Sequence, residues 1–411
     1  MRFSINIPSV LMIGCAMAAM GFSSQANAGA IQTVFVIAME NHNWTQPATD
    51  LSAPGQIFGS VAAPYINSLV TPGNPNAAQV SYASAYHNVL ATPSGANPSI
   101  HPSAPNYIWA EGGSNFGVLN DNTPFGVGGS NQNTPNSLSN YLQQSGKSWK
   151  SYQEDADINT GTNTVLPKSQ WTVPLANSSG VFASGTNAYN GSKQFNYAAK
   201  HNPEAYFTST NGGNDATPAN PLAGNYAPIQ QLASDLTNNT VANYNWITPD
   251  QFNDMHTALT GGFTYNGTHY TGDLAAIAQG DNFLSIVIPM IMASSAYQNN
   301  GLIDIWFDET EGTNANDFSH TLGEILISPD AKGNAYTNLI DYTHSSDLLT
   351  MQEIYGVGPC ILDACNATDL SDLLVKGSVR SGRIPEPASM TLLGAGLIGL
   401  FGARRRSAAK R

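Results

Sequence analysis

Two near-continuous apolar runs constrain the fold more than any other feature of this sequence. The first covers residues 32–39 and the second covers residues 301–307, and neither alternates polar with apolar side chains. Such runs are typical of strands that are buried on both faces of a parallel sheet. We therefore predict an α/β fold in which these strands belong to a sheet with helices on both faces.

Shorter strand and helix patterns alternate along the rest of the chain. This alternation favours a mixed sheet between two helix layers, and segments rich in Asn, Gly, Ser and Pro favour long surface loops. No repeat of fixed period and no second type of composition occurs, so we predict one domain. The predicted strands are residues 244–248 and 321–328, the predicted helices are residues 137–145, 228–236, 281–299 and 345–355, and the predicted loops are residues 111–136 and 156–192.

Residues 1–28 have the pattern of a secretory signal peptide. Arg2 precedes an apolar run from Val10 to Phe22, and residues 26–28 (Ala-Asn-Ala) form a cleavage site of small residues. A membrane anchor is the alternative, but the run is short for a bilayer and the cleavage site follows at once. We therefore expect the protein to be exported.

The end of the chain has a pattern of three parts. Residues 384–387 (Ile-Pro-Glu-Pro) precede an apolar stretch over residues 390–403, and residues 404–406 are three arginines. A short tail helix with a cationic anchor would have the same order. The pattern also resembles the PEP-CTERM sorting tail of Gram-negative bacteria, which a membrane-embedded exosortase removes during export. That resemblance implies transient membrane contact through residues 384–411, and a location at the cell surface, in the extracellular matrix or outside the cell.

The composition argues against some classes of partner. Only 10% of the residues are charged, and the formal net charge is -13. So acidic a chain should repel nucleic acid and anionic lipid surfaces, and we expect no nucleic-acid partner. An acidic protein that handles phosphate would need a cation to do so.

Three cysteines occur, and only two of them belong to the predicted mature protein. Cys15 lies within the predicted signal peptide, whereas Cys360 and Cys365 are close together in the sequence. In an oxidising compartment a disulfide between them is the default expectation. Because the loop is short, the expected gain in stability is modest.

Polar residues follow both apolar runs at once. Glu40 and Asn41 follow the first run, and Asp308 and Glu309 follow the second. Open α/β sheets form their sites at the carboxyl ends of strands, and a divalent cation with oxygen ligands would relieve the repulsion between adjacent acids. Two alternatives remain open: Glu40 could cap a helix, and Asp308 with Glu309 could form a solvated acidic loop.

Ser103 lies between two prolines in residues 101–107 (His-Pro-Ser-Ala-Pro-Asn-Tyr). Prolines restrict the backbone, and a restricted backbone can present a hydroxyl rigidly, as a nucleophile requires. A single serine of this kind is more often an ordinary loop residue, so the motif is weak in isolation.

Taken together, these motifs resemble the phosphoesterase family of acid phosphatases and C-type phospholipases. The family belongs to the alkaline-phosphatase-like superfamily, so the resemblance implies a mixed sheet between helix layers and a phosphoesterase domain over residues 29–380. The resemblance covers roughly residues 33–358. The motifs that carry it are MENH at residues 39–42, HPSAPNY at 101–107, NDMH at 253–256, FDETEG at 307–312 and SHT at 319–321, with smaller landmarks at residues 148–152, 200–203 and 342–356.

The resemblance implies a role for particular residues. One divalent cation (Mg, Ca, Mn or Zn) would be held by Glu40, Asn41, Asp308 and Glu309, and Ser103 would be the nucleophile. His256 would contact phosphate or donate a proton, Asn106 would hold the phosphoryl oxygens, and Asp254 and His320, which align more loosely, would help to bind substrate. The Asp-Pro-x-His element of the larger phospholipases is absent, and His87 or His101 could replace it as the leaving-group acid.

The expected activity is that of an exported, metal-dependent acid phosphatase, which hydrolyses phosphomonoesters through a phosphoserine intermediate. The alternatives are a phospholipase C that acts on phosphodiesters, a sulfatase-like or phosphonate-cleaving relative, and a non-catalytic surface or matrix protein. No catalytic role is predicted for the remaining histidines. His42, His201 and His344 are expected in the core or behind the site, and His269 receives no role.

Overall fold

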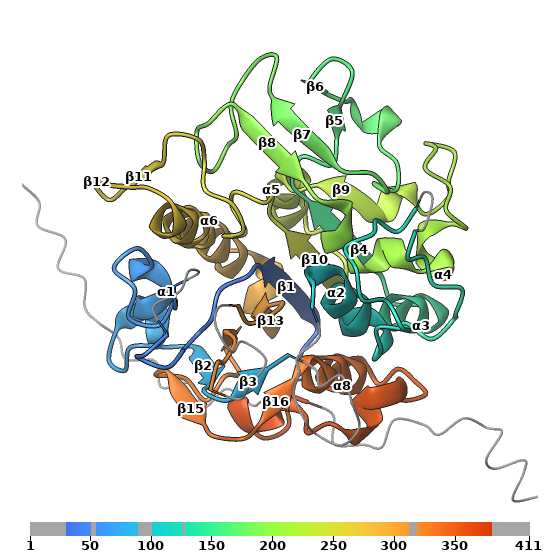
Figure 1. Ribbon diagram of the computed structural model, residues 1–411. Coiled ribbons are helices and arrows are strands. Elements are labelled where there is room, and N and C mark those ends of the chain that lie inside the picture. Colours follow the sequence, from blue (N-terminus) through green and yellow to red (C-terminus); the bar gives the residue numbers. More distant parts are fainter. Residues whose placement is uncertain (1–29, 51–54, 89–100, 126–128, 312–318, 380–411) are drawn as a thin grey trace, which may run out of the picture.

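An eight-stranded mixed sheet forms the centre of the computed structural model (Figure 1). The structure describes residues 30–50, 55–88, 101–125, 129–311 and 319–379, so the predicted signal peptide and sorting tail lie outside the described residues. In order across the sheet, the strands are β15 (Tyr336–Asn338), β2 (Val80–Ala83), β14 (Glu324–Ile327), β13 (Gly301–Phe307), β1 (Thr33–Met39), β10 (Tyr244–Thr248), β4 (Trp149–Gln153) and β9 (Tyr226–Pro228).

The strands from β13 to β9 run parallel to one another, whereas β14 is antiparallel to both β13 and β2. In the register of the central strands, Val36 of β1 lies between Asp304 of β13 and Trp246 of β10. Every residue of β10 and β13 is buried. Because parallel strands end at the same edge of a sheet, the residues that follow β1, β13, β10 and β4 share one edge.

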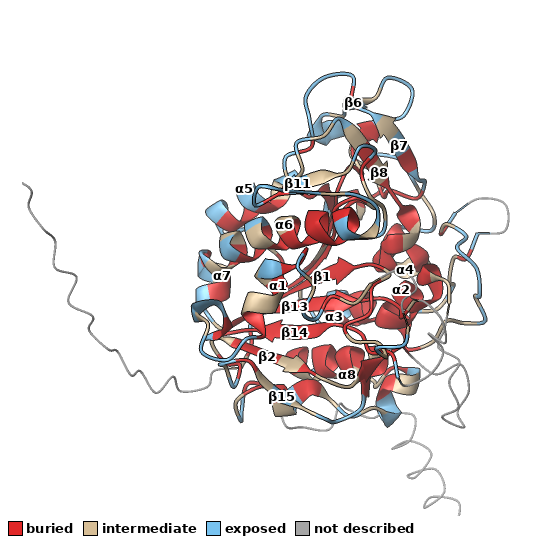
Figure 2. Ribbon diagram, turned by 60° about the vertical axis from the view of Figure 1, so that its left-hand side comes forward, coloured by how far each residue is buried: buried red, intermediate tan, exposed pale blue. Residues whose placement is uncertain are grey.

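Helices cover both faces of the sheet (Figures 1 and 2). On one side, α1 (Pro64–Leu69) packs against α6 (Asp273–Met292), and on the other side α8 (His344–Tyr355) packs against two further helices. Those two are α2 (Ser103–Gly112) and α3 (Leu138–Gln144), and the remaining α-helices of the described residues are α4 (Thr208–Asn211), α5 (Gln230–Asn238) and α7 (Ser295–Gln298).

Four small two-stranded sheets lie outside the central sheet. Two of them use the segment that was predicted as a loop over residues 156–192, so that prediction was wrong in part. Polar strands of two to four residues carry too little apolar alternation to be seen in the sequence. The pairs are β3 (Tyr86–His87) with β16 (Tyr342–Thr343), β5 (Ile158–Asn159) with β6 (Thr164–Val165), β7 (Ser178–Val181) with β8 (Gln194–Tyr197), and β11 (Phe263–Tyr265) with β12 (Thr268–Tyr270).

The predicted α/β class and the mixed sheet between helices are confirmed, but one predicted helix has different bounds. The helix expected over residues 281–299 begins at Asp273, after Gly272, and ends at Met292. The chain then starts a new helix, α7, because the side chain of Ser294 accepts a hydrogen bond from the backbone N–H of Tyr297 at 3.2 Å. The predicted disulfide between Cys360 and Cys365 is present.

Helix α6 is long and apolar enough to cross a membrane, yet 67% of its most apolar window is buried within the structure. Asp281 lies in the middle of this helix and is itself buried. Its two carboxylate oxygens accept the backbone N–H groups of Tyr65 and Ile66 at 2.9 and 2.7 Å, at the first turn of α1. A carboxylate of α6 thus caps the neighbouring helix, as expected of a core helix.

Asp281→Ala should lower the free energy of unfolding by about 2–3 kcal/mol, because two amide N–H groups lose a charged acceptor inside the protein. Asp281→Asn keeps one acceptor oxygen and should cost less. Urea denaturation of both variants beside the wild type measures the difference. A loss below about 0.5 kcal/mol in Asp281→Ala would contradict the capping role.

Candidate functional site

At the carboxyl ends of β1 and β13, the residues that follow the two strands form hydrogen bonds with one another. The backbone N–H of Asn41 donates to Asp308 Oδ1 at 3.0 Å. Its side-chain Nδ2 donates to Glu309 Oε1 at 3.2 Å and to Glu311 Oε1 at 3.0 Å. Asn41 has a φ of 45°, a left-handed conformation that asparagine tolerates better than most residues. The four residues predicted as metal ligands are therefore adjacent in space.

Ser103 is the first residue of α2, and its side chain points at the two acidic strand ends. Its Oγ lies 3.1 Å from Glu40 Oε2 and 2.9 Å from Glu309 Oε1, and the residue is buried. The expected rigid loop is instead a helix N-terminus, with Pro102 as the N-cap and Pro105 in the first turn. Because Pro105 has no N–H and the Ala104 N–H donates to Asp121, it is mainly the dipole of the helix that favours an anion such as a phosphoryl group beside the hydroxyl.

A second group of ligand-type side chains adjoins the first. His201 Nε2 lies 3.3 Å from Glu40 Oε1, and His201 Nδ1 lies 3.5 Å from Asp254 Oδ2. The phenol of Tyr107 donates to Glu40 and stacks on the His201 ring at 5.0 Å. Burial and the charge of Lys200 hold the pKa of His201 well below its usual value, so the ring is neutral and can bind a cation.

The acids at this edge are buried, and few hydrogen-bond donors or positive charges offset the cost of burying them. Burial raises the pKa of Glu40, and the charges of Asp308 and Asp254 raise it further. Burial and Glu309 likewise raise the pKa of Asp308. Asp308 Oδ2 and Asn41 Oδ1 are buried and have no hydrogen-bond partner. Buried polar atoms are rarely left without a partner, and oxygen ligands of this kind suit a divalent cation. The residues therefore fit the predicted metal.

Two further predicted residues contact Glu309. His101 Nδ1 lies 2.7 Å from Glu309 Oε2, and Asn106 Nδ2 is 3.5 Å from the same oxygen. Burial disfavours the charged form of His101, but the hydrogen bond and charge of Glu309 outweigh it and raise the pKa of His101. His101 Nε2 is buried without a hydrogen-bond partner. Of the two histidines considered as leaving-group acids, His101 has a described contact with Glu309.

Predicted residues His256 and His320 have different surroundings. The ring of His256 is 6.2 Å from that of His201, at the exposed side of the site. Partial burial of the ring and the charge of Lys200 lower the pKa of His256 to about 4. His320 Nε2 instead lies 2.9 Å from Asp50 Oδ2, and its carbonyl lies 3.1 Å from His87 Nδ1. The described contacts thus place His256 beside His201 and give no contact with the acidic residues after β1 and β13 for His320, so the roles of both residues stay predictions.

His42 and His344 lie behind the site, as expected, whereas His201 does not. His42 Nδ1 is 3.2 Å from the carbonyl oxygen of Glu40, and His344 Nε2 is 2.6 Å from that of Asp308. Both histidines therefore contact the backbone of a strand end. His201 lies between two carboxylates and was missed as a site residue. Its sequence signal was the KHNP landmark at residues 200–203.

Lys200 is a second site residue that the sequence did not single out. Its Nζ lies 2.7 Å from Asp121 Oδ2, and Asp121 Oδ1 accepts the backbone N–H of Ala104 at the start of α2. Burial disfavours its charged form, but Glu40, Asp121 and Asp308 outweigh that effect and raise the pKa of Lys200. A permanent positive charge therefore lies beside the acids, next to the helix that carries Ser103.

A family model matches residues 74–358, more than half of the chain, and its description is the Phosphoesterase family. The chain belongs to the Phosphoesterase family. Its members act on ester bonds, so the chain is of the ester-hydrolase class. Glu40 and Asn41 precede the matched segment, so their assignment to the site depends on the geometry above.

A second match, to the PEP-CTERM protein-sorting motif, covers residues 383–406 and indicates recognition by exosortase and export to the cell surface of a Gram-negative bacterium.

Solved structures with a similar arrangement are distant in sequence. The lipoteichoic acid synthase LtaP from Listeria monocytogenes has 10% identity and a TM-score of 0.44, over 82% of this chain and 76% of that chain. A protein in the alkaline phosphatase superfamily from Vibrio parahaemolyticus has 8% identity and a TM-score of 0.43, over 84% and 72%. A search of curated proteins found no match.

Asp308→Asn should weaken divalent-cation binding at this site by more than about 10-fold, because it removes a buried anionic ligand. Titration calorimetry with Mn²⁺ measures the change. Asp341→Asn, at an exposed position, is the matched control and should bind as the wild type does. Equal affinity in Asp308→Asn would remove Asp308 from the ligand set.

Proposed function

We propose that this chain is an exported acid phosphatase that hydrolyses phosphomonoesters through a phosphoserine intermediate on Ser103. One observation carries the proposal: the Ser103 hydroxyl, at a helix N-terminus, lies within hydrogen-bond distance of both Glu40 and Glu309. One carboxylate can accept the hydroxyl proton, while the positive end of the helix dipole favours the phosphoryl oxygens. Asn106, on the next turn of the helix, is assigned to those oxygens as well.

The proposed reaction has two displacements. In the first, Ser103 Oγ attacks phosphorus, the bond to the alcohol breaks, and the hydroxyl proton passes to a carboxylate while the alcohol takes up another proton. In the second, water attacks the phosphoserine, which releases phosphate and restores the hydroxyl. One divalent cation held by Glu40, Asn41, Asp308 and Glu309 would neutralise phosphoryl charge and favour the ionised hydroxyl.

His101 is our proposed donor of the leaving-group proton. Glu309 holds its Nδ1, so its Nε2 has a fixed direction and no other hydrogen-bond partner. His256 is then assigned to contact with phosphate, together with Lys200, whose charge suits an anionic ester. Asp254 lies beside His201 and Glu40. We assign it an indirect part in substrate binding, in which it holds these two neighbours in position.

The rest of the chain is proposed to serve export. Residues 1–28 would be removed as a signal peptide, residues 29–380 would form the phosphoesterase domain, and residues 384–411 would be the sorting tail. The negative charge of the chain disfavours nucleic acid as a substrate, and a phosphate ester would need the proposed cation to bind.

Ser103→Ala should reduce turnover of p-nitrophenyl phosphate by at least about 1,000-fold while the thermal unfolding midpoint stays close to that of the wild type. Acid-quenched wild type should carry one phosphoryl group at Ser103 by intact-mass and peptide analysis. The control is Ser145→Ala, an exposed serine after α3. Wild-type turnover in Ser103→Ala would refute the nucleophile assignment.

The substrate class can be decided by measuring the hydrolysis of three chromogenic esters, with and without a chelator. Chelator-sensitive cleavage of p-nitrophenyl phosphate alone supports the phosphomonoesterase. Cleavage of p-nitrophenyl phosphorylcholine would instead support a phospholipase C, and cleavage of p-nitrophenyl sulfate would support a sulfatase-like enzyme.

His101→Gln should slow hydrolysis of glycerol phosphate by roughly 100-fold or more, because an alkoxide needs a proton to leave. Hydrolysis of p-nitrophenyl phosphate should slow far less, since nitrophenolate leaves without one. His256→Gln is the matched control and should affect both substrates alike. An equal loss for both substrates in His101→Gln would exclude it as the proton donor.

A further inference from the structure

A second acidic group lies at the same edge of the sheet, outside the residues assigned to catalysis. Glu154 and Asp155 directly follow β4, and Asp250 follows β10 after one proline. Carboxylate oxygens of all three residues lie within 4.8 Å of one another. Their exposed fractions are 0%, 1% and 1%, so the three acids are buried together.

Two of the three carboxylates lack hydrogen-bond partners for some or all of their oxygens. Glu154 is satisfied, because Asn253 Nδ2 and Asn187 Nδ2 donate to its oxygens at 2.7–3.0 Å. By contrast, both oxygens of Asp155 and Oδ2 of Asp250 are buried and receive no hydrogen bond from an N–H or hydroxyl group of the described residues, and the two carboxyl groups interact with one another. Unpaired buried oxygens of this kind are rare in folded proteins and point to a ligand at the group.

No positive side chain is described beside this group. The lysine ion pairs of the described residues involve Asp121, Asp235 and Asp372. Burial and the charges of Asp250 and Glu154 raise the pKa of Asp155 well above its usual value. Burying uncompensated carboxylates is costly unless a cation or a proton neutralises them.

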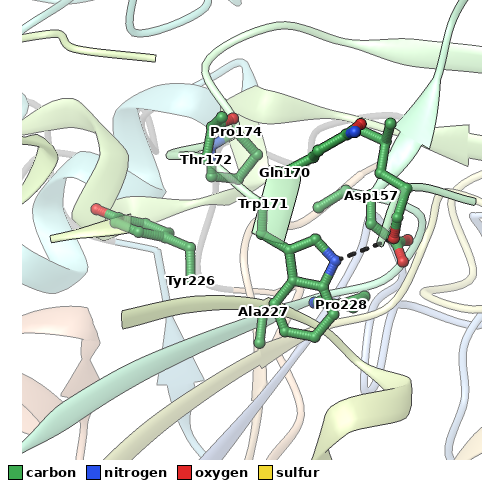
Figure 3. A pocket seen from close by; sticks show the side chains of 10 residues that line it. Asp157, Gln170, Trp171, Thr172, Pro174, Tyr226, Ala227 and Pro228 are labelled. Atoms are coloured by element: carbon green, nitrogen blue, oxygen red, sulfur yellow. Dashed lines mark hydrogen bonds between the residues drawn. The ribbon is translucent and has the colours of Figure 1, made fainter. Parts of the chain in front are cut away.

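A cavity gives this group a route to solvent. It has a volume of about 410 Å³, and Asp155, Asp157 and Asn187 contribute to its wall. Trp171 lines the same cavity and also lines a neighbouring cavity of about 20 Å³, where it lies close to Asp157 (Figure 3). Its indole N–H donates to the carbonyl of Leu166 at 3.3 Å. An ion in this cavity could therefore reach the buried carboxylate of Asp155 through a movement of side chains in the cavity wall, without unfolding of the sheet.

We propose that Glu154, Asp155 and Asp250 bind a divalent cation of the calcium type, separate from the cation of the catalytic site. The donor set contains carboxylate oxygens only, with Asp157 nearby as a further negative charge, and such hard, flexible ligands suit calcium better than a metal that prefers nitrogen or sulfur. The cation fastens the segment after β4 to the turn after β10.

The proposed cation has a structural consequence for the catalytic site. The backbone N–H of Asp254 donates to the carbonyl of Asp250 at 2.9 Å, and the carbonyl of Asp254 accepts the N–H of Glu40 at 2.8 Å. The turn that carries Asp250 therefore also carries Asp254 and His256. Binding at the second group fixes the direction in which this turn approaches Glu40.

The test counts calcium ions in the Asp308→Asn chain, at a calcium concentration too low to fill its weakened catalytic site. Equilibrium dialysis should find one Ca²⁺ per chain, and this ion should be lost when Asp155→Asn and Asp250→Asn are added. Adding Asp341→Asn instead should leave the count unchanged. Calcium should also raise the unfolding midpoint of Asp308→Asn and of its Asp341→Asn control, but not of the variant that lacks the two acids.

A second measurement keeps all three acids of the second group, in case the chain with Asp155→Asn and Asp250→Asn does not fold. Tb³⁺ bound to the Asp308→Asn chain should emit when tryptophan is excited, excess Ca²⁺ should quench the emission, and Trp171→Phe should reduce it several-fold. Absence of sensitised emission, or an unchanged calcium count after Asp155→Asn and Asp250→Asn, would overturn the proposal and indicate a shared proton instead. Neither readout depends on catalysis, so failure here is distinct from failure of the proposed phosphatase activity.

Discussion

The parallel pairing of β1 with β13 is the constraint on which the rest of the structure depends. The two strands are in register over seven residue pairs, from Thr33 beside Gly301 to Met39 beside Phe307. Both strands therefore end at the same height, and the next residue of each, Glu40 and Asp308, must lie at one edge of the sheet. A shift of register by one residue would turn these side chains to opposite faces.

This arrangement concentrates negative charge where the protein has little to compensate it. Glu40, Asp254, Asp308 and Glu309 are all buried, and the nearest described lysine, Lys200, is already paired with Asp121. Each buried carboxylate costs stability unless it is neutralised. The apolar core of the sheet offsets that cost, and cation binding would recover part of it, so folding stability and metal content should be linked.

The sequence predicted the acidic residues of the site and two of its histidines, His101 and His256, but it assigned no site role to His201 or Lys200. Glu40 and Asp308 follow buried apolar runs, and such runs have a direct physical signature, so both residues could be placed at one edge without a structure. His201 and Lys200 come from a short 3-10 turn after β8, at the end of a long polar segment whose path carries no apolar periodicity. The helix that presents Ser103 was also missed, since prolines at residues 102 and 105 indicated a loop, although the first turn of a helix tolerates them.

The backbone of Asp308 is further fixed by a histidine whose tautomer can be derived. Trp306 Nε1, which can only donate, lies 2.9 Å from His344 Nδ1, so that nitrogen accepts. Burial lowers the pKa of His344 to about 3, so the ring is neutral and its proton is on Nε2. That N–H donates to the carbonyl of Asp308 at 2.6 Å, while the phenol of Tyr86 donates to Asp347. A core tryptophan of β13 thus sets, through one neutral imidazole, the position of the strand end that the proposed metal site requires.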